Sequence, residues 1–339
     1  MTNSTPETLL DVKNLKTYFL TRQGTVRAVD DVSFSINRGE IVGLVGESGC
    51  GKSMTSMSIL RLVPQPAGRI VGGEIRFKGN NLLDKSEEEM RQIRGDRISM
   101  IVQDAMVSLN PLLKVGYQLA ETLKHHGKAL GAIKEKCVEL LNKVKVPSPE
   151  TRLEAYPFQF SGGMSQRVLI ANGIACDPDL IIADEPTTAL DVTIQAQILN
   201  LLQEIQQKVG ASVLLITHDL AVVAQICTRV LVMYAGRIVE EADIDTFFNN
   251  PSHPYAKGLI QSVPVLHKEV DRLFTIDGQP PSLFNPPLGC RFAPRCPDVM
   301  DKCLQAYPPK TTLEDGHHVS CWLYENTDEN NDNKSATEN

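Results

Sequence analysis

The sequence predicts an α/β fold in which a buried parallel sheet carries a phosphate-binding loop, and two observations support this prediction. A glycine-rich turn, GESGCGKS at positions 46–53, directly follows the short apolar run 41–45. That order is typical of a strand that ends in a loop for nucleotide phosphates. Three later apolar runs, at 180–183, 213–216 and 230–233, alternate with helix-like segments. Buried parallel strands joined by crossover helices explain the alternation.

The composition is that of an ordinary chain with enough apolar residues for a full core. The chain has 339 residues, of which 42% are hydrophobic, and a formal net charge of -7. We therefore expect no nucleic-acid partner, since phosphate contacts depend on clustered Lys and Arg. No apolar stretch approaches the roughly 18 to 20 residues that span a bilayer, and the first residues lack the order of a signal peptide. We expect the chain to stay in the cytoplasm and to reach a membrane only through partners.

The segments on either side of the phosphate loop differ in their periodicity. Residues 8–45 alternate apolar and polar positions around a turn-like TRQG at 21–24, which predicts antiparallel strands leading to the loop. Residues 54–63 predict a helix whose N-terminus faces the phosphates. Between about 87 and 176, apolar residues recur at spacings of three and four, which predicts an inserted helical subdomain.

The residue types of the loop suit a nucleotide triphosphate. Its glycines let backbone N–H groups turn toward phosphate oxygens, Lys52 supplies a positive charge to the β and γ oxygens, and the Ser53 hydroxyl can bind Mg²⁺. The alternative is a glycine-rich strand-to-helix turn without a ligand, but the flanking strand and helix favour phosphate binding. The predicted phosphate-binding residues are Gly46, Glu47, Ser48, Gly49, Cys50, Gly51, Lys52 and Ser53.

Two acids follow the apolar run 180–183, at the carboxyl edge where parallel sheets bind their ligands. We predict that Asp184 holds Mg²⁺ through water and that Glu185 is the general base for an attacking water molecule. Taken alone, such a pair more often caps the next helix. Its combination with the phosphate loop favours the catalytic interpretation.

The segment FSGGMSQ, at 160–166, joins a hydroxyl and two glycines at a predicted helix start, which suits an anion. With this segment the sequence resembles the ATP-binding subunit of an ABC transporter, whose S-G-G-x-x-Q signature occupies the same place. The resemblance implies a dimer in which two phosphate loops and two signatures enclose two ATP molecules. The residues implied to serve the ATP of the opposite protomer are Ser161, Gly162, Gly163 and Gln166.

Further elements of the family pattern follow in the expected order. The resemblance implies that Gln103 completes the shell of Mg²⁺ and water, while its loop senses the membrane subunits. It also implies that Asp191, in the D-loop, links the two protomers. Finally, it implies that His218 contacts the γ-phosphate and positions Glu185. Read alone, a histidine after a strand is more often structural, and only the complete pattern favours catalysis.

The predicted adenine site rests on a single aromatic residue. Phe19 occupies the place where the family stacks an aromatic ring on adenine, with Tyr18 as the alternative.

The chain departs from the usual pattern by carrying Phe160 and Ser165 in the signature segment, and by an Asp-Ala pair after Gln103. None of these departures removes a catalytic group.

The C-terminal region narrows the resemblance. The segments HPYA at 253–256, GQPP at 278–281 and GCRFAPRCP at 289–297 resemble the oligopeptide/dipeptide importer ATPases. The resemblance implies a [4Fe-4S] cluster on the four C-terminal cysteines, which are spaced C-x5-C-x6-C-x17-C. Zn²⁺ is the alternative, because four thiolates complete either site and the spacing alone does not settle the metal. Reduced thiols without a metal are the third possibility. His317 and His318 are expected to be solvated rather than zinc ligands. The implied cluster ligands are Cys290, Cys296, Cys303 and Cys321.

The expected fold class is therefore α/β: a P-loop NTPase core of the ABC ATPase type, with an antiparallel β subdomain, an inserted helical subdomain and a small Cys-rich C-terminal extension. The resemblance runs from about residue 9 to 324. We expect a nucleotide-binding domain over 8–255, with its helical subdomain at about 87–176. The importer-type extension is expected over 256–324 and a disordered polar tail over 325–339.

The resemblance implies an ATPase that powers import of di- or oligopeptides from the cytoplasmic face of the cell membrane, as a peripheral subunit. The implied partners are a second, related but different ABC ATPase, two transmembrane permeases and an extracytoplasmic solute-binding protein. Importers of nickel, glutathione or oligosaccharides have similar motors and remain alternatives. A soluble ABC ATPase of translation or DNA repair fits less well, because no second ATPase half is visible. A metal-sensing regulator would leave Lys52, Glu185 and His218 unexplained.

Overall fold

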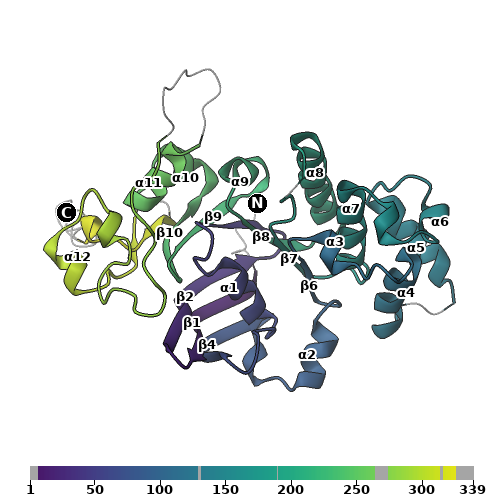
Figure 1. Cartoon of the computed structure of the whole chain (residues 1–339), viewed down its shortest axis with the longest axis horizontal. Helices are drawn as coiled ribbons and strands as arrows, with labels where there is room; N and C mark the ends of the chain where they lie inside the picture. The colour runs from purple at the N-terminus through teal and green to yellow at the C-terminus, as the bar shows by residue number, and fades with distance from the viewer. Residues whose placement is uncertain (1–6, 129–130, 189, 264–273, 314–315, 326–339) are drawn as a thin grey trace, which may run out of the picture. The chain divides into compact units, whose positions relative to one another are not determined.

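The computed structural model describes residues 7–128, 131–188, 190–263, 274–313 and 316–325. The chain divides into two compact units that alternate along the sequence, and their chain positions can be followed by colour in Figure 1. Unit 1 consists of Met1–Asp11, Ser35–Ile41 and Arg76–Ile216. Unit 2 consists of Val12–Phe34, Val42–Ile75 and Thr217–Asn339. Among the described residues, no helix combines the length and the apolar character needed to cross a bilayer.

The sheet of unit 1 has the parallel order that the apolar runs predict. Its middle strand pairs in parallel with both neighbours, so that Leu180 lies opposite Ile98 on one side and Ser212 on the other. Every residue of the middle strand is buried, as expected for a strand covered on both faces. The strand ends at Asp184, which brings the predicted acids to the sheet edge. In spatial order the strands are β6 (Ile98–Ile101), β7 (Leu180–Asp184) and β8 (Ser212–Thr217).

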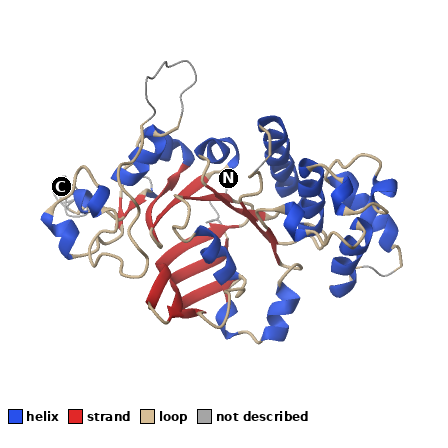
Figure 2. Ribbon diagram, viewed as in Figure 1, coloured by secondary structure: helices blue, strands red, loops and turns tan. Residues whose placement is uncertain are grey.

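Four helices of unit 1, α3, α4, α5 and α8, contact one central helix, α7. Figure 2 shows these five helices as a blue group beside the strands of the same unit. Helix α4 buries Val115, Leu119 and Leu123, whose spacing of four places them on one face. The helices are α2 (Glu87–Ile93), α3 (Ala105–Ser108), α4 (Val115–His125), α5 (Ile133–Lys143), α6 (Pro149–Arg152), α7 (Gly162–Gly173) and α8 (Val192–Val209).

A four-stranded sheet, most of it in unit 2, has the order β2-β1-β4-β5. Only two residues, Arg22 and Gln23, separate its first two strands, and a link that short joins antiparallel neighbours. The predicted turn at 21–24 is thereby confirmed as a hairpin. The strands are β1 (Thr8–Thr21), β2 (Gly24–Asn37), β4 (Gly68–Phe77) and β5 (Asn80–Asn81).

A second set of strands in unit 2 carries the phosphate loop and has the order β11-β12-β10-β9-β3. Strand β3 is parallel to β9, with Val45 opposite Val232, whereas β9 and β10 form an antiparallel hairpin. Its turn residues, Ala235 and Gly236, have positive φ of 46° and 86°, as a type I′ turn requires. The strands are β3 (Ile41–Val45), β9 (Arg229–Tyr234), β10 (Arg237–Asp243), β11 (Thr311–Thr312) and β12 (His318–Val319).

An aromatic cluster joins the C-terminal part of unit 2 to the strands that carry the loop. The ring centroids of Tyr234 and Tyr255 are 4.6 Å apart, and Phe292 lies 5.2 Å from Tyr234 and 5.4 Å from Tyr255. All three side chains are fully buried, so the C-terminal segment shares its core with the end of β9. The helices of unit 2 are α1 (Lys52–Ile59), α9 (Leu220–Ile226), α10 (Ile244–Asn249), α11 (Pro254–Gln261) and α12 (Asp301–Gln305).

Two expectations about chain segments need comment. The helix predicted over 54–63 begins two residues earlier and ends at Ile59, and Arg61 beyond it has a left-handed φ of 53°. The disordered tail predicted over 325–339 lies outside the described residues, apart from Glu325.

Candidate functional site

The phosphate-binding loop follows β3 and is closely packed by backbone of unit 2. Gly46 has a φ of 154°, and a Cβ there would lie 2.1 Å from the Met233 carbonyl oxygen. Gly51 has a φ of 112°, and a Cβ there would lie 2.4 Å from the Ala28 carbonyl oxygen. Only glycine fits these two positions without displacing backbone. The glycines that the sequence motif singled out therefore have a packing reason as well as a conformational one.

Lys52 lies at the start of α1 and is 5% exposed. Its Nζ donates hydrogen bonds to the carbonyl oxygens of Gly46 at 2.7 Å and Glu47 at 3.1 Å, which curls the loop around the ammonium group. The next residue, Ser53, is exposed in the first turn of the helix. The helix start leaves backbone N–H groups without intrahelical acceptors, so an ammonium, a hydroxyl and N–H donors are offered together to an anion.

Glu47 of the loop is held by residues that the sequence analysis did not single out. The Arg295 guanidinium binds its carboxylate through two hydrogen bonds, of 2.8 Å and 3.0 Å. The Glu47 backbone N–H donates to the Tyr255 hydroxyl at 2.9 Å. Both partners stand in segments noted for family resemblance, HPYA and GCRFAPRCP, but the sequence carries no signal that pairs them with a residue some 200 positions away.

In unit 1, a group that we call the Glu185 cluster consists of Gln103, Glu185 and Thr188. Gln103 Nε2 donates to Glu185 Oε2 at 2.9 Å, and Thr188 Oγ1 donates to the same oxygen at 2.8 Å. The Glu185 backbone has a left-handed φ of 48°, and its N–H donates to the Ile216 carbonyl at 2.8 Å. Sparsely populated backbone conformations of this kind concentrate at functional sites. Sequence reasoning found Gln103 and Glu185 and missed Thr188.

The donor types at this edge suit magnesium. Asp184, 6% exposed, ends β7 with a carboxylate next to Glu185 in the chain, and Gln103 offers an amide oxygen because its nitrogen binds Glu185. Mg²⁺ prefers carboxylate, amide and hydroxyl oxygens of this kind. In unit 2, Ser53 carries a further oxygen donor of the same class.

The signature segment forms the start of α7. Ser161 is the N-cap, and its hydroxyl accepts a hydrogen bond from the Met164 N–H at 3.4 Å. A Cβ on Gly163 would lie 2.6 Å from the side chain of Ile194, so the helix start packs closely against α8. Gln166 is only 3% exposed, and within the described residues its Nε2 has no hydrogen-bond partner. The serine and the glycines thus lie at the helix end, while the glutamine points into unit 1.

Asp191 and His218 both lie just before helices. Asp191 is exposed and caps α8 by accepting a hydrogen bond from the Ile194 N–H at 3.0 Å. His218 is exposed after β8, and its neighbour Asp219 caps α9 through the Ala221 N–H at 2.9 Å. The capping aspartates fix the chain direction beside each predicted functional residue.

The two candidates for adenine stacking, Tyr18 and Phe19, differ in the contacts that they make within the protein. The Tyr18 hydroxyl donates to Asp30 at 2.5 Å, and burial together with this hydrogen bond raises the Tyr18 pKa to about 12. Asp30 in turn pairs with the buried Arg291. Phe19 is half-buried, and its ring lies near Gly68, where a Cβ would be 2.9 Å from Phe19 Cε1. Tyr18 is therefore held by a hydrogen bond within the protein, which favours Phe19 as the residue that stacks on adenine.

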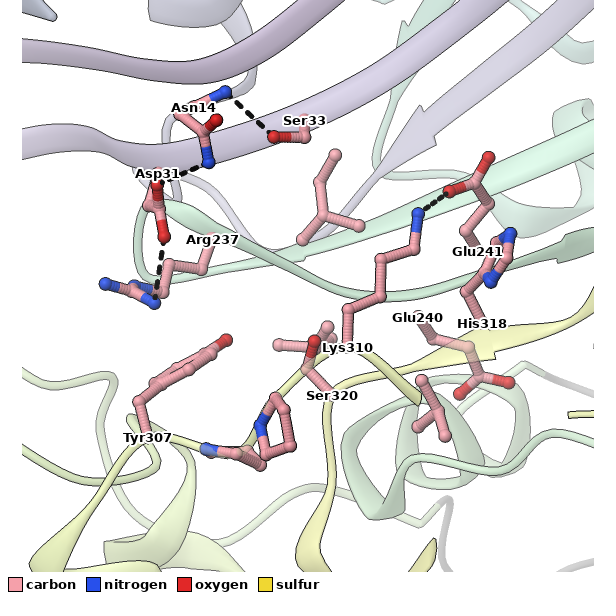
Figure 3. A pocket seen from close by; sticks show the side chains of 15 residues that line it. Asn14, Asp31, Ser33, Arg237, Glu240, Glu241, Tyr307, Lys310, His318 and Ser320 are labelled. Atoms are coloured by element: carbon pink, nitrogen blue, oxygen red, sulfur yellow. Dashed lines mark hydrogen bonds and ion pairs between the residues drawn. The ribbon is translucent and has the colours of Figure 1, made fainter. Parts of the chain in front are cut away.

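A separate cavity of about 350 Å³ opens between β10 and the C-terminal segment of unit 2 (Figure 3). None of the predicted site residues lines it. Lys310 points to Glu241, with 2.8 Å between Nζ and Oε2, and Arg237 lies 3.8 Å from Asp31 (Figure 3). Because its opposite charges are paired with one another, the cavity does not select a ligand of either sign.

Comparisons with known proteins agree with this geometry. Residues 29–188 match the ABC transporter family, and residues 239–303 match the C-terminal region of the oligopeptide/dipeptide transporter family. The Dipeptide transport ATP-binding protein DppD of Bacillus subtilis is 53% identical over 318 residues, which cover 94% of this chain and 95% of the relative. The Probable peptide ABC transporter ATP-binding protein y4tR of Sinorhizobium fredii is 50% identical over 322 residues, covering 94% and 96%.

Among solved structures, a dimeric ATP-binding cassette in a post-hydrolysis state, bound to ADP and Pi, superimposes with a TM-score of 0.63. It is 28% identical, and the match covers 70% of this chain and 99% of that cassette. The mixed α/β architecture of the matched part of the chain is therefore that of an ABC ATPase.

The predicted iron–sulfur cluster, and the zinc site offered as its alternative, are wrong. All four cysteines are described, yet no three His, Cys, Asp or Glu side chains in the described part of the chain are grouped to hold a metal ion. None of the relatives named above is described as an iron–sulfur protein. Burial raises the pKa of Cys296 and of Cys321 to about 11. Cys290, Cys303 and Cys321 are buried and Cys296 is half-buried.

The expectation that His317 is solvated is also corrected. Its ring is 4% exposed, and Nε2 lies 2.7 Å from the buried Glu240 carboxylate. His318 is half-buried, with Nδ1 3.0 Å from the Thr312 hydroxyl. The sequence around His317 is hydrophilic and gave no sign that this residue is buried against the Glu240 carboxylate.

Proposed function

This chain belongs to the ABC transporter family, and from that premise we propose that it is the ATP-binding and ATP-hydrolysing subunit that powers peptide import through an ABC transporter complex. The match of its C-terminal region to the oligopeptide/dipeptide transporters supports di- or oligopeptides as cargo. Nickel, glutathione and oligosaccharides are cargo of other importers with similar motors, and nothing in the fold or the matches favours them here. The chain acts as an ATPase, and its cargo is contacted by its partners.

The observation that carries the hydrolytic role is the Glu185 cluster. Gln103 and Thr188 both donate to Oε2 of Glu185, which fixes the direction of the carboxylate. We assign Glu185 as the general base that takes a proton from water as the water attacks the γ-phosphate. The double hydrogen bond to one oxygen leaves the base oriented before substrate arrives.

Binding of ATP is assigned to the phosphate loop, from Gly46 to Ser53, with Phe19 stacking on adenine. Lys52 transfers from the loop carbonyls to the β and γ oxygens, which replace them as partners of the ammonium. Ser53, Gln103 and Asp184 are the proposed Mg²⁺ ligands, since all three offer hard oxygen donors. The ion would neutralise charge that develops on the phosphate oxygens.

The remaining motif residues are assigned to the partner protomer. Ser161, Gly162 and Gly163 stand at the start of α7, where a hydroxyl and N–H groups suit the γ-phosphate of the opposite ATP. Gln166 is assigned to support that helix start from inside unit 1, in agreement with its burial. Asp191 links the protomers, and His218 contacts the γ-phosphate.

The complex that we propose places this chain at the cytoplasmic face of the membrane, as a peripheral subunit. Its partners are a second, related ABC ATPase, two transmembrane permeases and an extracytoplasmic solute-binding protein. The Gln103 loop and the helical segment at 87–176 relay ATP-driven movement to the permeases. The nucleotide-binding domain spans 8–255, and the C-terminal extension, without a metal cluster, spans 256–324.

Reconstitution of the complex tests this function. The chain would be tagged, purified from native membranes in detergent with everything that it retains, and inserted into liposomes. We expect two permeases, a second ATPase and ATP hydrolysis that rises several-fold when the solute-binding protein is loaded with a di- or oligopeptide. Stimulation by nickel, glutathione or an oligosaccharide instead would show that this solute, and not a peptide, is the cargo. Recovery of only soluble factors would overturn the transport role.

A further inference from the structure

The contact between Arg295 and Glu47 joins two parts of unit 2 that are 248 residues apart in sequence. The guanidinium and the carboxylate face each other with two parallel hydrogen bonds, 2.8 Å and 3.0 Å long. The Arg295 side chain is 4% exposed and that of Glu47 is 28% exposed. A two-pronged pair with a buried arginine fixes both position and orientation, which an exposed single contact does not.

The Arg295 guanidinium is itself held rigidly by the C-terminal segment. Its Nε donates to the Asp277 carbonyl at 2.9 Å, and a terminal nitrogen donates to the Ile276 carbonyl at 3.1 Å. The other terminal nitrogen donates to the Tyr234 hydroxyl at 3.2 Å. These bonds hold the two terminal nitrogens that face Glu47 in one orientation. Any displacement of the C-terminal segment would therefore move Glu47 and the phosphate-binding loop.

Glu47 is held at its backbone by the same region. Its N–H donates to the hydroxyl of Tyr255, a residue of the buried aromatic cluster with Tyr234 and Phe292. The aromatic cluster rests on the segment that carries Arg295, since Phe292 lies in the turn before it. Both ends of Glu47 are thus tied to the C-terminal half of unit 2.

The carbonyl oxygen of Glu47 accepts a hydrogen bond from Lys52. One residue therefore connects the lysine that serves the phosphates to the arginine of the C-terminal segment. A shift of Glu47 would move the loop N–H groups and change the competition between loop carbonyls and phosphate for the ammonium. Glu185 belongs to unit 1 and is oriented by Gln103 and Thr188 of the same unit, so the hydrolytic step is expected to depend little on this pair.

We propose that Arg295 is a positioning residue of the phosphate-binding loop, through which the C-terminal segment sets the affinity of the chain for ATP. The inference rests on the proposed ATPase function and adds a control over the same site. Arg295 itself touches no reacting atom. It acts on Glu47, and Glu47 shapes the loop that receives the phosphates.

The test compares Arg295→Lys, which keeps the charge and loses the two-pronged fork, with the wild-type chain in the reconstituted complex. We expect the KM for ATP to rise about tenfold, a change that corresponds to about 1.4 kcal/mol of binding free energy, while kcat stays within twofold. Direct binding of ATP by the full-length chain, measured by calorimetry, should weaken by the same factor. Unchanged KM and affinity in the folded variant would overturn the proposal.

A matched control separates loop positioning from general attachment of the C-terminal segment. Lys310→Gln removes another cation of this segment, whose partner Glu241 lies in β10 rather than in the loop. It should leave the KM for ATP unchanged. An equal rise in KM for both variants would mean that any loosening of the segment suffices, and would contradict a specific role for Arg295.

A second variant keeps the proposal testable if Arg295→Lys does not fold. Glu47→Gln weakens the same pair from the loop side, and it should also raise the KM more than kcat falls. In the double variant the two effects should be far from additive, because both act on one contact. Additive effects would refute the proposal that Arg295 acts on the loop through Glu47. A wild-type complex that neither binds nor hydrolyses ATP would instead refute the proposed function itself.

Discussion

The phosphate-binding loop and the Glu185 cluster are held in place by contacts of different range. The loop is enclosed by backbone, with Met233 and Ala28 against its glycines, and anchored by Arg295 from far along the chain. The Glu185 cluster depends on two side-chain hydrogen bonds within one unit, and both donors, Gln103 and Thr188, are exposed. Binding thus depends on long-range packing, whereas hydrolysis depends on a small local group.

Because of this difference, ATP binding and ATP hydrolysis are expected to fail in different ways. A change in the loop should disturb the fold and ATP affinity together, because the same contacts supply both. A change in the Glu185 cluster should alter the chemical step and leave stability and affinity nearly intact, because exposed hydrogen bonds contribute little to folding. Variants of single residues in each region can separate the two effects.

Glu185→Gln should separate hydrolysis from binding most strongly. The amide keeps the size of the side chain and cannot accept the proton of the attacking water, so kcat should fall by about 10² to 10⁴. ATP affinity should stay within about twofold. Steady-state hydrolysis and equilibrium ATP binding, measured on the same preparation, check both statements. Normal turnover would remove Glu185 from the role of base.

Gly46→Ala should damage the loop and the fold together. The added Cβ would lie 2.1 Å from the Met233 carbonyl oxygen, so backbone must move, and we expect a loss of roughly 3 kcal/mol in unfolding free energy. ATP binding should be lost as well. Chemical denaturation and calorimetry measure the two quantities.

Gly49→Ala is the matched control for this change. Gly49 has a φ of 77°, but apart from its two chain neighbours no heavy atom of the described residues lies within 4 Å of a Cβ built there. Its variant should lose only about 1 to 2 kcal/mol, the cost of the left-handed backbone alone. Equal losses in the two variants would show that packing against Met233 does not constrain the loop.

Thr188→Val should weaken the orientation of Glu185 without removing it. The variant loses one of the two hydrogen bonds to Oε2, and we expect kcat to fall by about tenfold, which is about 1.4 kcal/mol. The KM for ATP and the melting temperature should not change. Thr122→Val, which breaks a 2.7 Å hydrogen bond to Asn172 in the same unit, is the control and should leave kcat unaltered.

His253 predicts a pH effect on the stability of unit 2. Burial lowers the pKa of His253 to about 3, and its Nδ1 accepts the Tyr255 N–H at 3.0 Å, so the folded state requires the neutral ring. The stabilisation is present above the unfolded pKa of about 6.5 and is lost as the pH falls toward 3. At pH 5.5 the loss should be about 1.4 kcal/mol relative to neutral pH.

The comparison variant is His253→Asn, which can still cap α11 and does not titrate in this range. Unfolding free energies at pH 7.5 and pH 5.5 should differ less for this variant than for the wild type. The adjacent carboxylate of Glu240, which accepts the Ser252 and His253 N–H groups, is present in both proteins and cancels from the difference. An equal pH dependence would show that His253 is not the titrating group.

Much of the fold could be predicted because its signals are local. The apolar run at 180–183 became β7 with one added residue, Asp184, and the loop motif lies between a buried strand and a helix as predicted. Gln103 and Glu185 were also predicted, and the structure brings them within hydrogen-bonding distance of each other. Periodicity and short motifs report on neighbours in the chain, and these features depend on neighbours.

The features that could not be predicted depend on residues distant in sequence. No pattern connects Arg295 with Glu47 or His317 with Glu240, since tertiary packing alone brings them together. The cysteine cluster suggested a metal site, but spacing in the sequence does not reveal how the four thiols are placed in the fold or whether they bind a metal. For Gln166, likewise, the motif indicated a ligand contact and gave no sign that the side chain is buried.

Loop anchoring is expected to set ATP affinity, while the Glu185 cluster is expected to set the rate of hydrolysis. The most direct test is to measure ATP affinity and kcat side by side for Arg295→Lys and Glu185→Gln in the same reconstituted complex. We expect about tenfold weaker affinity with nearly normal kcat for the first variant, and nearly normal affinity with kcat lower by at least about 10² for the second. If both variants changed affinity and rate in the same proportion, the separation of binding from hydrolysis would be contradicted.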